Sequence, residues 1–146
     1  MEKRTGDDAR AEIEKYVEKF DAEVFELTNI DESAVKSNLE SEFNKSGETP
    51  EQGKYEGDNR AHVIDDYKLL SNNCTTKSLD AVEAGNGNKP LTYKTEVKSP
   101  KMSGGRASVK MHINSISPAD LSKQLNTATK DPKAGVKEIT KQYENK

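Results

Sequence analysis

The spacing of the apolar residues changes near residue 90, and this change constrains the fold more than any other feature of the chain. In residues 8–28 apolar side chains recur every three or four positions, which is the spacing of one helix face. In residues 91–98 and 106–113 they alternate with polar ones, which is typical of a half-buried strand. The sequence therefore predicts an α+β domain in which helices come first and paired strands follow.

Five segments carry the helical pattern, and most follow a residue that can cap a helix. The predicted helices cover residues 8–28, 31–45, 59–71, 78–84 and 118–129, with Asp7 or Asp8, Asp31, Ser78 and Ser117 as caps. Residues 46–58 are rich in Gly, Glu and Pro, which predicts a polar loop. In the tail, Val136, Ile139 and Tyr143 lie at near-helical spacing.

The two alternating segments are separated by Ser-Pro-Lys-Met-Ser-Gly-Gly, a composition typical of a hairpin loop. Each strand then has one apolar face, which we expect to pack on the helices, and one polar face that is mostly basic. We expect residues 1–146 to form a single domain, with helices on one face of a curved antiparallel sheet. Residues 1–7 and 130–146 are expected to be flexible.

Charge is distributed unevenly around a net value of −3. Residues 1–73 carry 10 basic and 19 acidic side chains, whereas residues 74–146 carry 13 basic and 7 acidic ones. This split suggests halves that attract each other, or one surface of each sign. No apolar run is long enough for a membrane helix, and the opening Met-Glu-Lys-Arg is too polar for a signal peptide, so an exported form is expected to be a mature fragment.

No catalytic or cofactor motif is recognisable. His62 and His112 lack partners at metal-ligand spacing, and Cys74 has no general base at motif spacing. The segment Ala-Gly-Asn-Gly-Asn at residues 84–88 matches neither the G-x-x-x-x-G-K-S/T pattern nor the G-x-G-x-x-G pattern of phosphate-binding loops. One cysteine also excludes an internal disulfide. The sequence therefore predicts a protein that is not an enzyme and needs no cofactor or metal.

Two candidate sites remain, and each has a simpler alternative. The basic hairpin face comprises Lys94, Lys98, Lys101, Arg106, Lys110 and His112. Such a face suits phosphates, a polyanionic cell wall or an acidic protein, but it lacks aromatic residues to stack bases, and the pI near 5.5 argues against nucleic acid. The alternative is a solvated face that neighbours the acidic half.

The second candidate site is a pocket between helices and sheet. The residues that could line it are Tyr16, Phe20, Tyr67, Tyr93 and Met111. The same side chains could equally form an ordinary hydrophobic core.

The hairpin at residues 91–113, its exit Ile116-Ser117-Pro118-Ala119-Asp120-Leu121 and the apolar stripe of the first helix together resemble small extracytoplasmic lipoproteins of Gram-positive bacteria. The resemblance implies a cystatin-like or nuclear-transport-factor-2-like fold and a location at the cell envelope. In such proteins a lipid-bearing cysteine precedes the first helix. Because the only cysteine here is Cys74, we expect any lipid anchor in a precursor segment. The Gln-x-Val-x-Gly loop of cystatin inhibitors is absent, so protease inhibition is not implied.

These observations favour a non-enzymatic binding or accessory domain of the cell envelope, which recognises an unknown protein or polyanion through the outer sheet face or a shallow pocket. One alternative is a small enzyme or small-ligand binder that uses a helix–sheet cavity. Another is a cytosolic or phage-encoded interaction module.

Overall fold

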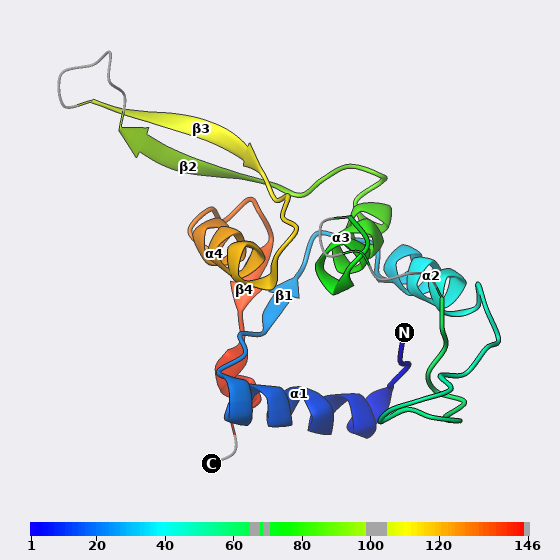
Figure 1. Ribbon diagram of the computed structural model, residues 1–146. Helices are drawn as coiled ribbons and strands as arrows, with labels where there is room; N and C mark the ends of the chain where they lie inside the picture. The colour runs from blue at the N-terminus through cyan, green and yellow to red at the C-terminus, as the bar shows by residue number, and fades with distance from the viewer. Residues whose placement is uncertain (65–67, 69–70, 99–104, 145–146) are drawn as a thin grey trace.

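The computed structural model describes residues 1–64, 68, 71–98 and 105–144 (Figure 1). In chain order the elements are α1 (Gly6–Phe20), β1 (Phe25–Leu27), α2 (Glu32–Phe43), α3 (Cys74–Gly85), β2 (Thr92–Lys98), β3 (Arg106–His112), α4 (Pro118–Ala128), β4 (Val136–Glu138) and the 3₁₀ turn η1 (Thr140–Gln142). This mixture of helices and antiparallel strands confirms the expected α+β class.

The described strands form two separate sheets rather than one curved sheet. β1 pairs with β4, and β2 pairs with β3, both antiparallel. Helix α4 contacts both β2 and β4, and in Figure 1 it lies between the two sheets. The expectation of a single curved sheet is therefore wrong, because a helix occupies the position through which the sheet would have continued.

The first helix ends earlier than its apolar stripe predicted. Asp21 adopts a left-handed conformation (φ 49°, ψ 38°), and its backbone N–H donates to the carbonyl of Tyr16, which stops α1 at Phe20. Leu27, which the helical spacing assigned to the same stripe, instead lies in strand β1. The prediction of one helix over residues 8–28 is thus wrong in its second part.

Two of the four predicted caps are confirmed. The carboxylate of Asp31 accepts hydrogen bonds from the backbone N–H groups of Ser33 and Ala34. The hydroxyl of Ser117 accepts one from Asp120 N, and Pro118 follows at the first helical position.

The other two caps differ from the prediction. Thr5 stands at the cap position of α1, so the two aspartates predicted there lie inside its first turn, beside the positive helix end. Helix α3 begins four residues before Ser78, because Asn73 and Thr76 form a reciprocal capping box.

One other helix prediction fails in the described residues. Residues 59–64 are not helical, and Ala61 instead forms an isolated bridge with Glu2; residues 65–67 and 69–70 of that predicted helix lie outside the described part. In the tail, Val136 lies in strand β4, whereas Ile139 and Tyr143 flank η1, so their near-helical spacing does not mark an α-helix. Val136 instead pairs with Leu27, since a tertiary partner overrides a weak local pattern.

A buried hydrophobic cluster lies around α4 and the base of the β2–β3 hairpin. Its buried members are Leu91, Tyr93, Ile113, Ala128, Ala134 and Val136. Ile113 is 1% exposed and has the largest fully buried side chain among the described residues. Beyond this base the hairpin extends away from the rest of the molecule, as Figure 1 shows at the upper left. The base is therefore anchored, and the outer part stands in solvent.

Candidate binding surface

The hairpin register decides which side chains share a face. β2 and β3 pair from Thr92 opposite His112 to Lys98 opposite Arg106, with no bulge between. Opposite residues lie on the same side of a sheet. The even-numbered positions therefore form one face, which carries all the basic residues predicted in the two strands, and the odd-numbered positions form the apolar face.

Five of the six predicted basic residues lie together on this face, and all five are exposed: Lys94, Lys98, Arg106, Lys110 and His112. The sixth, Lys101, lies outside the described residues. We call these five residues the basic hairpin face. Strand pairing alone brings them together, as the alternation predicted.

The basic residues meet directly across the hairpin. Ile113 N–H donates to the carbonyl of Leu91 at 2.8 Å, so the odd-numbered pairs exchange the cross-strand hydrogen bonds. The even-numbered pairs are then the non-hydrogen-bonded ones, in which side chains approach most closely. Lys94 lies opposite Lys110, and Lys98 lies opposite Arg106. Like charges in this arrangement destabilise a hairpin by roughly 0.2–1 kcal/mol each.

One acidic residue that the sequence interpretation left out of the charge cluster moderates this repulsion. Glu96 shares the basic hairpin face, and its Oε2 lies 3.3 Å from Arg106 Nη1. Both side chains are more than three-fifths exposed, so the ion pair is weak. The alternation of β2 already placed Glu96 on this face. Lys94, Lys98 and Lys110 form no salt bridge within the described residues.

The acidic half of the chain does not neutralise the basic hairpin face. Two salt bridges join described residues of the two halves, Lys77 to Glu42 at 2.8 Å and Lys137 to Glu26 at 3.7 Å. Neither comes from the hairpin. In the described part of the molecule the positive charge of this face is therefore left to solvent or to a partner, apart from the weak pair of Arg106 with Glu96.

Helix α4 and the turn after it cover the strand edges near the base. Gln124 accepts from Asn114 N at 2.8 Å and donates to Asn114 O at 2.9 Å, so its amide pairs with the edge that continues β3. Asp131 accepts from Lys94 N at 2.6 Å on the opposite edge, that of β2. Backbone hydrogen bonds from Lys94 and Lys133 lower the pKa of Asp131 below its usual value. Sequence reasoning missed both residues, and only the Asp-Pro after the helix hinted at a turn there.

The residues predicted to line a helix–sheet pocket are not brought together. Tyr16 and Phe20 contact each other on α1 with ring centroids 5.5 Å apart, and both are exposed. Tyr93 is buried in the cluster at the hairpin base, and Met111 is exposed on the apolar hairpin face. Tyr67 lies outside the described residues. The four described side chains therefore occupy three different surroundings.

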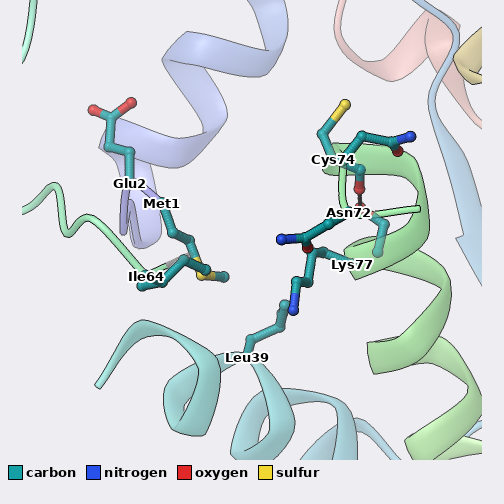
Figure 2. A pocket seen from close by; sticks show the side chains of 9 residues that line it. Met1, Glu2, Leu39, Ile64, Asn72, Cys74 and Lys77 are labelled. Atoms are coloured by element: carbon teal, nitrogen blue, oxygen red, sulfur yellow. Dashed lines mark hydrogen bonds between the residues drawn. The ribbon is translucent and has the colours of Figure 1, made fainter. Parts of the chain in front are cut away.

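A different cleft, of about 460 Å³, opens between α2, α3 and the N-terminal residues. Figure 2 shows Met1 and Ile64 on one side, Asn72 and Cys74 on the other, and Leu39 below them. Lys77 lines the cleft as well, and its Nζ binds Glu42. Hydrogen bonds from Lys45 and then Lys77 lower the pKa of Glu42. The cleft is thus mainly apolar, with one cationic group already engaged by a carboxylate.

His62 and Cys74, which the sequence offered for acid–base or nucleophilic chemistry, do not line the same cleft. His62 stacks on Phe43 with a centroid distance of 3.8 Å, and its Nδ1 hydrogen-bonds the carbonyl of Phe43. Cys74 is exposed at the start of α3, on the cleft that His62 does not line. Among the described residues no group of three or more His, Cys, Asp or Glu side chains is placed to hold a metal ion.

None of the described helices combines the length and the apolar character that crossing a membrane requires. No protein-family model, curated protein or solved structure matches this chain. Its function must therefore be argued from the geometry of its own residues.

Proposed function

We propose that this chain is a non-enzymatic binding module that recognises an anionic partner through the basic hairpin face. The observation that carries the proposal is the direct pairing of Lys94 with Lys110 and of Lys98 with Arg106 on an exposed hairpin. An anion that bridges each pair would relieve a repulsion that the free protein must tolerate. The hairpin extends from a buried base, so a partner can approach this face without contacting the rest of the molecule.

We further propose that the module works at the cell envelope as an accessory domain. This part rests on the resemblance of its element order and its Ser117-Pro118 exit to extracytoplasmic lipoproteins with a cystatin-like or nuclear-transport-factor-2-like fold. Because the described strands form two small sheets, the likeness is one of element order rather than of a continuous sheet. A lipid anchor, if the precursor carries one, would hold the module near the anionic components of an envelope.

Binding of poly-L-glutamate and of polyphosphate, followed by fluorescence anisotropy at increasing salt, tests the proposal. The variant with Lys94, Lys98, Arg106 and Lys110 all changed to glutamate should lose binding of both polymers. A matched control changes Lys19, Lys36, Lys89 and Lys141 to glutamate; these residues form no salt bridge within the described part. The control gives the same net charge and should retain most of the binding. Equal loss in both variants would show a net-charge effect and overturn the proposal.

A second candidate function is binding of a small, mainly apolar ligand in the cleft of Figure 2, favoured by its volume of about 460 Å³. Alkylation of the exposed Cys74 at its rim should block any such ligand while leaving poly-L-glutamate binding intact. A fragment screen by ligand-observed NMR, run before and after alkylation, separates the two functions. Absence of any fragment that Cys74 alkylation displaces would remove this candidate.

A further inference from the structure

The outer edge of β3 is open where the outer edge of β2 is partly closed. Even-numbered residues direct their backbone N–H and C=O groups away from the partner strand, since the odd-numbered pairs make the cross-strand bonds. On β3 these residues are Arg106, Ser108, Lys110 and His112. No hydrogen bond to their backbone groups occurs among the described residues. The edge therefore presents a row of donors and acceptors that a further strand could use.

The same edge already accepts a peptide-like partner one step further along the chain. Gln124 uses its side-chain amide to bind both the N–H and the C=O of Asn114, which is how one residue of an added antiparallel strand would bind. Asn114 continues the even-numbered series of β3. Helix α4 thus covers the edge only at its base, and no described residue binds the outward backbone groups of the four β3 residues farther from that base.

A second copy of the chain fits this edge poorly. In an antiparallel pairing of two β3 strands, the outward residues of both copies are Arg106, Ser108, Lys110 and His112. The register with full overlap places Arg106 opposite His112, and a shift of two residues either way places Arg106 opposite Lys110 or Lys110 opposite Lys110. Such pairs are unfavourable, and charged residues of this kind are a common protection against self-association of edge strands.

The chemistry of the two faces defines a different occupant. Residues opposite Arg106, Lys110 and His112 would lie on the basic hairpin face, so acidic side chains suit those positions. The intervening residues would lie beside the apolar face, where Val97 is 42% exposed and Met111 is 41% exposed. A strand with acidic and apolar residues in alternation therefore complements both faces at once.

We infer that the outer edge of β3 is a strand-addition site for an extended segment of a partner protein in which acidic and apolar residues alternate. This inference rests on the proposed function and deepens it, because it names the partner as a protein strand and the contact as backbone pairing. The basic hairpin face supplies recognition of charge, while the β3 edge supplies register and direction.

A peptide of about nine residues, in which glutamate alternates with valine and threonine, tests the inference with the full chain. Two methylated forms are compared with it: one carries N-methyl groups on all glutamate nitrogens, the other on the intervening nitrogens. In an added strand only one of these alternating sets faces β3. One form should therefore bind about tenfold or more weakly, while the other binds like the parent peptide. The form that fails also reports whether the added strand is parallel or antiparallel.

A variant of the chain provides the second test. Ser108→Pro removes the outward backbone N–H of residue 108 and leaves the cross-strand hydrogen bonds of the odd-numbered pairs intact. An edge-strand position whose N–H points outward tolerates proline. Ser108→Thr is the matched control and should bind the peptide normally. On peptide addition, backbone amides of Arg106, Lys110 and His112 in the natural chain should become protected from hydrogen exchange.

These experiments distinguish the strand-addition site on β3 from the anion-binding function on which it rests. If both methylated peptides bind like the parent and no edge amide gains protection, charge alone attracts the peptide; the strand-addition site is then refuted and the anion-binding function stands. If the peptide, poly-L-glutamate and polyphosphate all fail to bind, both proposals fail. If Ser108→Pro lowers stability, the methylated peptides still decide the question with the unaltered chain.

Discussion

The base and the outer part of the β2–β3 hairpin share one pattern and have opposite environments. At the base, Leu91, Tyr93 and Ile113 are 7%, 6% and 1% exposed. Farther along the same apolar face, Val97 and Met111 are about two-fifths exposed. Alternation set the face of each side chain in both parts, whereas burial depended on whether α4 lies beneath it. An apolar residue in an alternating strand therefore indicates which side chains share its face, but it does not by itself show that the side chain is buried in the core.

The largest expected difference between the two parts is in the cost of truncation. Ile113→Ala should lower the free energy of unfolding by about 2–5 kcal/mol, because it removes buried methyl groups and leaves a cavity. Urea denaturation followed by circular dichroism measures this loss. Ile113→Val, with an expected loss of about 0.5–1.5 kcal/mol, keeps the comparison measurable if the alanine variant is unfolded. A loss below about 0.5 kcal/mol for Ile113→Ala would mean that the hairpin base is not anchored.

A smaller effect is expected where α4 covers the edge of the hairpin. Gln124→Ala removes both hydrogen bonds to the backbone of Asn114 and should cost about 1 kcal/mol, since water can replace part of the pairing. Hydrogen exchange should also show faster exchange of the Asn114 amide. Gln124→Glu is the informative control, because it keeps an acceptor for Asn114 N but has no donor for Asn114 O. Unchanged exchange in both variants would argue against edge covering.

Asp131 provides a test that depends on pH. Its folded pKa lies below the usual value, so the carboxylate stabilises the fold above the unfolded pKa of about 4, and this contribution is lost as pH falls through the lower folded pKa. Asp131→Asn should therefore lower the urea midpoint at pH 6 and have little effect at the most acidic pH tested. Its effect at pH 6 should be smaller than that of Gln124→Ala, because Asp131 satisfies one N–H of the hairpin. A difference between the two proteins that does not change with pH would contradict this role.

The smallest effect is expected in the outer part of the apolar face. Val97→Thr and Met111→Gln should each change the free energy of unfolding by no more than about 0.5 kcal/mol, since both side chains already contact solvent. The same substitutions should weaken binding of the alternating peptide, because they remove apolar contacts with its intervening residues. Equal binding by the natural chain and both variants would show that the apolar face takes no part in recognition.

Local patterns allowed some elements to be predicted closely, and the reasons differ from case to case. The strands at residues 91–98 and 106–113 differ from β2 and β3 by one residue at an end, because strict alternation over seven positions suits a strand with two unlike faces and does not suit a helix. Ser117-Pro118 located the start of α4, since both residues act through their own backbone geometry. In contrast, the apolar stripe of residues 8–28 continued past Asp21, where a single left-handed residue ended the helix.

Of the candidate site, the sequence predicted only which side chains share one face of the hairpin. Alternation by itself assigned Lys94, Lys110 and their neighbours to one face. The roles of Gln124 and Asp131 depend on where α4 and its following turn lie. A side chain that hydrogen-bonds backbone groups far away in the sequence belongs to no periodic pattern, so the sequence did not indicate either residue. The pocket residues failed for the opposite reason. These residues are apolar or aromatic, as a pocket lining requires, but the four described ones lie in three different parts of the structure and line no common pocket.

The sequence by itself determined the α+β class, the paired strands of the hairpin with their two faces, and the positive charge of the polar face. These properties follow from short-range spacing and from side-chain chemistry. Only the tertiary structure decided that the described strands form two sheets, that α4 separates them and that no described residue covers the outer part of the hairpin. Those features depend on contacts between residues far apart in the chain, such as Leu27 with Val136, and no local pattern specifies them.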